Sequence, residues 1–116
     1  MKRLPVKYIR DAAKRRYQKD EKCYICASRE KLEFHHYYSV SELVKKYISI
    51  NKLSPDNILE WRDDFIEAHK VELFEACVTL CSAHHANLHS IYGQHPSLAT
   101  AEKQRKWVSI QRTKHV

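Results

Sequence analysis

Cysteine and histidine side chains gather in two parts of this 116-residue sequence, at spacings that suit metal binding. Cys23 and Cys26 form a C-x-x-C pair, and the segment VTLCSAHHANLHSIYG at residues 78–93 places one cysteine and three histidines within nine positions. Thiolate sulfur and imidazole nitrogen are the ligands that zinc takes in structural sites, four of them in a tetrahedron. The sequence therefore predicts at least one bound metal ion.

The expected structural zinc site takes one pair of ligands from each part of the sequence: Cys23, Cys26, Cys81 and His84. A C-x-x-H pair across the turn into a helix brings both of its side chains to one point. Cys77 is the rival ligand. If residues 76–80 form a strand, however, Cys77 lies about 13 Å from Cys81 along it, whereas each sulfur bound to a zinc ion lies about 2.3 Å from the metal. We therefore expect Cys77 to be a small buried hydrophobic residue.

A second metal-binding face is expected on the helix that follows the last cysteine. His85 and His89 stand four residues apart on one face, as two ligands of one metal do, and this face is rotated about 100° from His84. The tandem pair His35 and His36 is the natural source of further ligands. Because adjacent side chains on a strand point to opposite sides, the two should have different roles. One could ligate the ion while its neighbour acts on a water molecule.

The elements that must position these residues follow from the spacing of apolar residues, from capping residues and from turn signals. Two short strands and several helices give an α+β fold in one domain, residues 1–116. The expected parts are a basic helix at 1–22, a core at 23–36 and 76–93, a helical insertion at 37–75 and a basic helix at 97–116. Within the insertion we expect two helices, capped by Ser41 and Ser54. The helix of the core should be capped by Ser82 and end at Gly93.

The formal charge of +7 is concentrated at the two ends of the chain. Residues 1–22 carry nine Lys and Arg against three acids, residues 98–116 carry five against one, and the middle is mildly acidic. Two cationic flanks favour a polyanion such as nucleic acid as partner, although solvated helix faces would show the same composition. No signal peptide or membrane-spanning run is visible, so we expect an intracellular protein whose cysteines bind metal rather than form disulfides.

The segments CYIC, LEFHH and VTLCSAHHANLH occur in this order, and the pattern resembles the HNH nucleases, also called ββα-metal endonucleases, in the subgroup whose fold is held by a structural zinc. The basic ends and the segment LHSIYG are further similar to small free-standing HNH proteins encoded by phages. The resemblance covers about half of the chain. It implies a ββα-metal core, a β-hairpin plus a helix, with the insertion between the strands and a basic helix on each flank.

The resemblance also implies roles for four histidines. His36 would be the general base that activates water, while His35, His85 and His89 would hold a catalytic divalent ion. This ion would be Mg²⁺ or Mn²⁺, with Zn²⁺ or Ni²⁺ as alternatives. The expected reaction is phosphodiester hydrolysis in DNA, with RNA left open as a substrate, and the products would carry 5′-phosphate and 3′-hydroxyl ends. A neutral imidazole can accept a proton near pH 7, and a divalent ion can stabilise the charge of the transition state.

The sequence departs from the family pattern at one position. Where family members commonly have the central asparagine, this chain has Ala76. Glu75, Glu72 and His69 are the candidates for orienting His36 in its place. Because of this departure, two alternatives to the enzyme stay open. One is a zinc-stabilised module that binds nucleic acid or a protein partner without cutting, and the other is an inhibitor or host-takeover protein that uses the fold as a platform.

The basic flanks are the expected DNA-binding elements, since they carry most of the positive charge. The residues expected to contact phosphates are Lys14, Arg15, Arg16, Lys103, Arg105 and Lys106. If the protein is encoded by a phage, it should act in the cytoplasm of the bacterial host cell. It could act there as a monomer or as a homodimer. Whether one strand or both strands are cut would depend on whether two copies act together.

Overall fold

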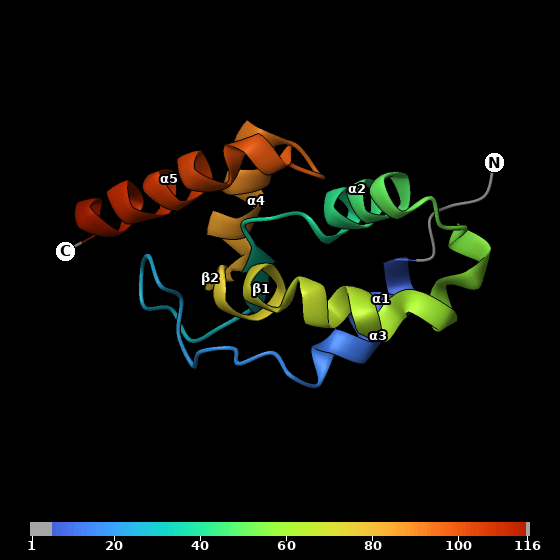
Figure 1. Ribbon diagram of the computed structural model, residues 1–116. Helices are drawn as coiled ribbons and strands as arrows, with labels where there is room; N and C mark the ends of the chain where they lie inside the picture. The colour runs from blue at the N-terminus through green and yellow to red at the C-terminus, as the bar shows by residue number, and fades with distance from the viewer. Residues whose placement is uncertain (1–5, 116) are drawn as a thin grey trace.

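The computed structural model describes residues 6–115, and in it a two-stranded hairpin lies between two groups of helices. Figure 1 shows α4 and α5 toward one end of the molecule and α1, α2 and α3 toward the other. The elements in chain order are α1 (Val6–Lys14), β1 (Leu32–His36), α2 (Val40–Asn51), η1 (Pro55–Asn57), α3 (Ile58–Ala68), η2 (Val71–Glu75), β2 (Cys77–Cys81), α4 (Ser82–Tyr92), η3 (Leu98–Thr100) and α5 (Ala101–Lys114). The predicted α+β class, with a hairpin and a helix at its centre, is confirmed.

The two strands pair antiparallel, with Leu32 opposite Cys81 and His36 opposite Cys77. The second strand was predicted at residues 76–80 and begins and ends one residue later. This register places the end of the C-x-x-C segment beside the start of α4, and it places the tandem histidines at the other end of the hairpin. The hairpin therefore separates the two groups of metal-binding side chains.

Helix α1 is shorter than the basic helix predicted for residues 1–22. Its apolar stripe is buried as the spacing predicts: Val6, Ile9 and Ala13. The helix ends at Lys14, and beyond it the ring of Tyr17 stacks on Phe34 of β1 with centroids 4.7 Å apart. Packing on the hairpin thus takes the place of further helical turns. Residues 1–5 of the predicted helix lie outside the described residues.

The connection between the strands holds α2, the 3₁₀-helix η1, α3 and the π-helix η2. The prediction that Ser41 caps the first of these helices is wrong. Ser39 is the cap, because its hydroxyl accepts a hydrogen bond from the backbone N–H of Glu42, and Ser41 lies inside the helix. The second predicted cap is confirmed, since the Ser54 hydroxyl accepts from the N–H of Asp56.

Helix α4 follows β2 without a loop and carries three of the histidines singled out in the sequence. Ser82, predicted as its cap, is instead its first residue, and Cys81 occupies the N-cap position. The predicted end is confirmed at Gly93, whose φ of +91° is one that other residues rarely adopt. The last predicted helix forms η3 followed by α5. Among the described residues, no helix is long and apolar enough to cross a bilayer.

The buried apolar side chains form two clusters on either side of the hairpin. The first, here called the insertion core, joins α1, α2, α3 and η2, and its fully buried members are Ile9, Ala13, Val44, Phe65 and Leu73. The second, here called the knuckle core, joins the C-x-x-C segment, β2, α4 and α5, and includes Cys23, Leu80, Leu88 and Val108. Tyr38 packs against both clusters. The hairpin and this tyrosine therefore connect two separately packed halves.

Candidate metal centre and nuclease site

Three cysteines and one histidine come together where the C-x-x-C segment meets the start of α4. Their ligand atoms all lie within 4.8 Å of one another: Cys23, Cys26, Cys81 and His84. The sulfur atoms of Cys26 and Cys81 are 3.9 Å apart, and Nδ1 of His84 lies 3.2 Å from the sulfur of Cys81. Tetrahedral zinc with these ligands separates neighbouring ligand atoms by about 3.5 to 3.8 Å. The four residues thus fit a structural zinc ion.

The backbone of the C-x-x-C segment holds its first cysteine in place. The N–H of Ala27 donates to the carbonyl of Cys23 over 2.9 Å, and the N–H of Cys23 donates to the carbonyl of Ser28 over 2.7 Å. Burial raises the pKa of Cys23, but hydrogen bonds from the backbone at Cys26 and Cys81 outweigh it and hold this pKa below its usual value. The thiolate, which is the form that binds zinc, is favoured as a result.

Cys77 lies apart from this cluster, at the other end of β2. Its thiol donates to the carbonyl of Leu73 over 3.2 Å, and burial raises its pKa to about 12. A thiol with so high a pKa stays protonated at neutral pH and is a poor metal ligand. Cys77 thus lies outside the zinc cluster as expected, but its side chain is half-buried rather than buried.

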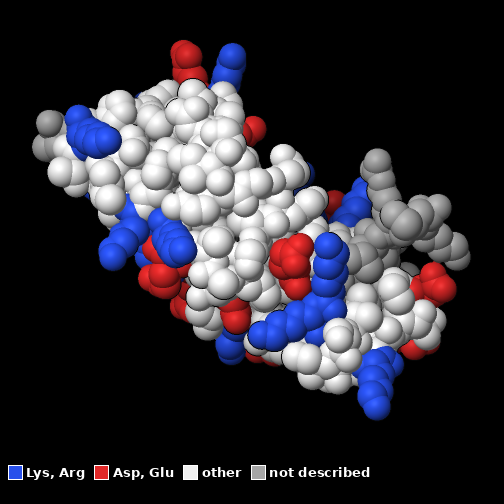
Figure 2. All heavy atoms as spheres, turned by 90° about the horizontal axis from the view of Figure 1, so that it is seen from above, with Lys and Arg blue, Asp and Glu red and all other residues white. Residues whose placement is uncertain are grey.

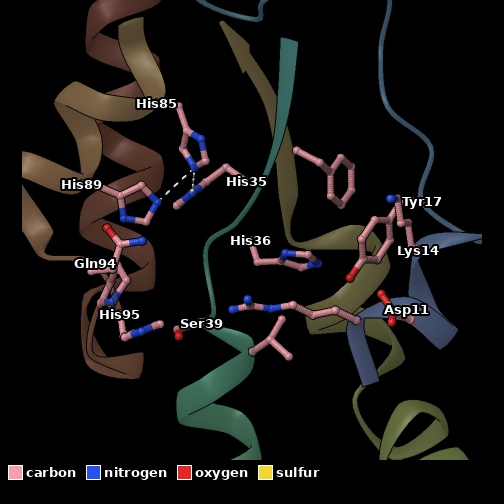
Figure 3. A pocket seen from close by; sticks show the side chains of 14 residues that line it. Asp11, Lys14, Tyr17, His35, His36, Ser39, His85, His89, Gln94 and His95 are labelled. Atoms are coloured by element: carbon pink, nitrogen blue, oxygen red, sulfur yellow. Dashed lines mark hydrogen bonds between the residues drawn. The ribbon is translucent and has the colours of Figure 1, made fainter. Parts of the chain in front are cut away.

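A second cluster forms where α4 crosses β1. Nδ1 of His35 lies 3.1 Å from Nε2 of His85, and this nitrogen lies 3.0 Å from Nε2 of His89. The three imidazoles point toward one another from two elements (Figure 3). His35 is 2% exposed, and burial lowers its pKa to about 3, so its ring is neutral. The structure therefore brings together the three residues that the resemblance assigns to a catalytic ion.

Each of these imidazoles also turns its second ring nitrogen toward an oxygen atom. The pairs are His85 Nδ1 with Glu33 Oε1 (2.9 Å), His89 Nδ1 with the Gly93 carbonyl (2.8 Å) and His35 Nε2 with Gln104 Oε1 (2.8 Å). A carboxylate or carbonyl oxygen accepts, so each outer nitrogen carries the hydrogen. If all three rings are neutral, the inner nitrogens present lone pairs, with Nε2 of His85 3.1 Å from Nδ1 of His35 and 3.0 Å from Nε2 of His89, an arrangement that is repulsive alone and suits a cation. The three histidines could hold a divalent ion.

His36 points away from this cluster, because neighbouring side chains alternate along β1. Figure 3 shows its ring turned toward Tyr17, and the two ring centroids are 5.0 Å apart. Nε2 of His36 donates to the carbonyl of Leu73 over 3.0 Å. Burial lowers the pKa of His36 to about 4, the hydrogen bond to Leu73 opposes this shift, and the nearby Arg10 guanidinium adds to it. The imidazole is thus neutral at pH 7, with Nδ1 free of hydrogen-bond partners among the described residues.

The group that orients His36 is a backbone carbonyl, which corrects the expectation of a side chain. The predicted candidates were Glu75, Glu72 and His69; none of them forms a hydrogen bond with His36 in the part of the chain that the structure describes. Nδ1 of His69 instead lies 3.5 Å from Oε1 of Glu72. At the position of the expected asparagine, the N–H of Ala76 closes the π-helix by donating to the carbonyl of Val71 over 2.8 Å. This turn brings the Leu73 carbonyl to His36.

A cavity of about 520 Å³ gives access to both sets of imidazoles. His35, His85 and His89 line it on one side, and His36 lies on the other side of β1. Across from the imidazole cluster, the cavity is lined by Arg10, Asp11, Lys14 and Tyr17. The hydroxyl of Tyr17 is buried and has no hydrogen-bond partner among residues 6–115, and burial raises its pKa to about 12. The site thus combines the neutral imidazoles of His35 and His36 with the cationic side chains of Arg10 and Lys14.

The six basic residues predicted to contact phosphates are all exposed. Of these, Lys14 lines the cavity. The guanidinium of Arg16 lies 4.3 Å from the ring centroid of Phe74, and that of Arg105 lies 5.2 Å from the ring centroid of Tyr37, so both are held beside aromatic rings. On the face in Figure 2, Lys and Arg side chains stand apart around a largely uncharged centre. Positive charge is therefore distributed rather than gathered in one patch on that face.

Three residues of the site were missed by the sequence analysis. Arg10 lies one turn before Lys14 on α1, a spacing that could have identified it. Glu33 lies two residues before His35 on the same face of a strand, which is also readable from the sequence. Gln104 carries no such signal, because it lies far along the chain in a segment of mixed charge.

The whole chain, residues 1–116, matches the model described as the nicking endonuclease family, whose name refers to phage T5. No solved structure matches the chain. The family match includes both basic flanks and the insertion, which lie outside the histidine and cysteine motifs. Nicking endonucleases act on DNA, which agrees with the basic composition and with the cavity lined by imidazoles and cationic side chains. The chain therefore belongs to the phage T5 nicking endonuclease family and is a nuclease that acts on DNA.

Proposed function

We propose that this protein is a metal-dependent endonuclease of the HNH type, which hydrolyses one phosphodiester bond of a DNA strand at each catalytic event. In this proposal His35, His85 and His89 hold a catalytic divalent ion, and His36 is the general base. Cys23, Cys26, Cys81 and His84 hold a structural zinc ion. Family membership favours this enzyme over a zinc module that binds DNA without cutting it.

The observation that carries the proposal is the convergence of three imidazole lone pairs beside a cavity that also contains His36. With the hydrogen of each ring on its outer nitrogen, the three inner nitrogens would be a ligand set for one divalent ion. Imidazole suits borderline ions, so we expect Mn²⁺, Ni²⁺ and Zn²⁺ to bind more tightly than Mg²⁺. The abundance of Mg²⁺ in cells keeps it a candidate for the working ion.

The proposed reaction is attack of a water molecule on the scissile phosphorus. Nδ1 of His36 accepts a proton from this water, while Nε2 stays bonded to the Leu73 carbonyl and fixes the direction of the ring. The water oxygen bonds to phosphorus, the bond from phosphorus to the 3′-oxygen breaks, and this oxygen takes a proton from solvent. A divalent ion held by His35, His85 and His89 would supply stabilisation of the negative charge that develops on the phosphate and on the leaving oxygen. The products are 5′-phosphate and 3′-hydroxyl ends.

The cationic side of the cavity supports a substrate with phosphates. Arg10 and Lys14 lie one helical turn apart and line the cavity together, opposite the imidazole cluster. A strand that enters the cavity would place a phosphate between these cations and the ion. We propose that Lys14 and the other exposed basic residues of the two flanks bind neighbouring phosphates of the same duplex: Arg15, Arg16, Lys103, Arg105 and Lys106.

A plasmid assay tests the proposal. Wild-type protein should convert supercoiled plasmid to the open circular form with Mg²⁺ or Mn²⁺, and excess EDTA should stop it. His36→Ala should bind DNA and Mn²⁺ normally but cut at least about 100-fold more slowly, whereas His89→Ala should lose both Mn²⁺ binding and cutting. Zinc content should stay at one ion per chain in both variants. Tight, salt-sensitive DNA binding without any cutting by the wild type would instead support the non-catalytic module.

A further inference from the structure

Gln104 is an uncharged, fully buried side chain on the most basic helix of the protein. It lies on α5 between Lys103 and Arg105, both of which are exposed, while its own exposure is 0%. A buried amide needs partners for both of its ends, because an unpaired polar group costs free energy in the interior. One of these partners is His35 of the imidazole cluster.

The orientation of the Gln104 amide follows from its hydrogen bonds. Its nitrogen lies 3.1 Å from the carbonyl oxygen of Tyr37, which can only accept, so this end must be the donor NH₂ group. The same nitrogen lies 3.0 Å from the hydroxyl oxygen of Thr100. That hydroxyl uses its own hydrogen to bond the Ser97 carbonyl over 2.6 Å, so it too must accept from Gln104. The amide oxygen is therefore the end that faces His35.

This orientation fixes where the hydrogen of His35 lies. The Gln104 oxygen is 2.8 Å from Nε2 of His35 and can only accept, so Nε2 carries the hydrogen. Nδ1 is left as a lone pair, 3.1 Å from Nε2 of His85. Without this acceptor, a neutral His35 could carry its hydrogen on Nδ1 and donate it to His85. Such a bond would occupy two of the three nitrogens that the ion requires.

We propose that Gln104 is a positioning residue that holds His35 in the tautomer able to bind the catalytic ion. The inference rests on the proposed ion site at His35, His85 and His89. It makes α5 part of that site, although this helix lies outside the histidine motifs. Outer partners of metal-binding histidines typically change metal affinity about 10- to 100-fold when they are removed.

Two substitutions separate this role from a purely structural one. Gln104→Met keeps a similar volume but removes the acceptor for His35 as well as the donors to Tyr37 and Thr100. Gln104→Glu is the matched control, because it keeps an oxygen acceptor facing His35 and removes the amide donors. If Gln104 acts only as core packing, both variants should be impaired alike. If it positions His35, only the methionine variant should lose affinity for the ion.

The measurements use the zinc-loaded full chain, with Mn²⁺ as the probe ion. Mn²⁺ affinity follows from electron paramagnetic resonance titration, zinc content from elemental analysis, and the tautomer of His35 from long-range ¹H–¹⁵N NMR. We expect Gln104→Met to bind Mn²⁺ about 10- to 100-fold more weakly and to shift His35 toward the Nδ1–H tautomer. Gln104→Glu should keep Mn²⁺ affinity within about threefold of wild type and retain the Nε2–H tautomer.

Three results would overturn the inference. The first is equal Mn²⁺ affinity in wild type and Gln104→Met, and the second is an equal loss of affinity in both variants. The third needs no variant and so does not depend on Gln104→Met folding: an Nδ1–H tautomer of His35 in the wild-type protein without Mn²⁺. A wild type that neither binds Mn²⁺ nor nicks plasmid would contradict the proposed function itself. Normal binding and nicking by the wild type, combined with an unaffected Gln104→Met, would contradict only the role of Gln104.

Discussion

The imidazole of His36 donates a hydrogen bond to the backbone carbonyl of Leu73 over 3.0 Å, within the π-helix that precedes β2. A regular π-helix would pair this carbonyl with the N–H five residues later, but that residue, Val78, already belongs to the strand. The carbonyl is therefore available to His36. Because a backbone atom orients the ring, the site does not need an asparagine side chain at Ala76 for this purpose.

The first prediction concerns the base itself. His36→Ala should reduce the cutting rate about 10²- to 10⁴-fold, the usual contribution of a general base, while the dissociation constant for DNA stays the same. Added imidazole should restore part of the missing rate, since a small base can enter the space left by the side chain. Single-turnover cleavage with and without imidazole measures both effects. A variant that cuts at the wild-type rate would show that His36 is not the base.

The second prediction distinguishes the two cysteines of β2. Cys81→Ser should lose the bound zinc ion, because it removes one of four ligands. Cys77→Ser, the matched control on the same strand, should retain one zinc ion per chain. Elemental analysis of the purified variants measures this directly. Loss of zinc from the Cys77 variant alone would reverse the assignment of the ligands.

The third prediction follows from the pKa of Cys77, which burial raises to about 12. At pH 8 only about one thiol in 10⁴ is then ionised, and the thiolate is the form that reacts. In the zinc-loaded protein a thiol reagent should find no fast-reacting cysteine, and EDTA should release three. The slow reaction of Cys77 should speed up about tenfold for each unit of pH increase while the fold persists. Fast modification of Cys77 at pH 8 in the zinc-loaded protein would contradict this raised pKa.

The fourth prediction concerns Gly93, whose carbonyl accepts the hydrogen bond from Nδ1 of His89. Its φ of +91° and ψ of 169° lie where a side chain is strained, although within the described part of the chain no atom beyond the adjacent residues lies within 4 Å of the place that a Cβ would take. Gly93→Ala should therefore destabilise the protein by about 1–3 kcal/mol through backbone strain alone. The displaced carbonyl should also weaken Mn²⁺ binding by about tenfold. Thermal unfolding and Mn²⁺ titration test this, with the exposed Ser90→Ala on the same helix as control.

The fifth prediction tests the cationic surfaces. Lys14→Glu, at the cavity, and Lys106→Glu, on α5, should each weaken DNA binding and reduce the salt slope of log K by about 0.9 for each phosphate that the variant no longer neutralises. Lys46→Glu changes the charge by the same amount on an exposed position of α2 and should have a smaller effect. Binding isotherms at several salt concentrations provide the slopes. Equal reductions in all three variants would mean that net charge, rather than placement, governs binding.

The features that the sequence predicts best are those that depend on residues lying close together along the chain. The C-x-x-C pair, the cluster of histidines on one helix and the end of that helix at Gly93 all follow from local geometry, and the structure brings their partners together. The prediction of a cap at Ser41 is wrong because Ser39, two residues earlier, has the same hydroxyl group and accepts the capping hydrogen bond. Such a choice depends on how the preceding strand ends, which local patterns do not specify.

The features that the sequence does not reveal depend on contacts between distant segments. Helix α1 ends early because Tyr17 packs on the hairpin, and no local signal marks that contact. The role of the Leu73 carbonyl cannot be predicted from the sequence, because every residue has a backbone carbonyl. Only the fold determines which of them accepts the hydrogen bond from His36. In the sequence, Gln104 is one polar residue among several on a charged helix, and only the folded structure shows its contact with His35.

The division into an insertion core and a knuckle core has a mechanical consequence. The cavity lies at the seam between them, since Arg10 and Lys14 belong to the helix of one core and His85 and His89 to the helix of the other. A small hinge rotation at the hairpin would change the width of this seam without disrupting the packing of either half. The proposed structural zinc would brace only the knuckle side. The cationic side of the groove, which belongs to the insertion core, would lie outside the region that such an ion cross-links.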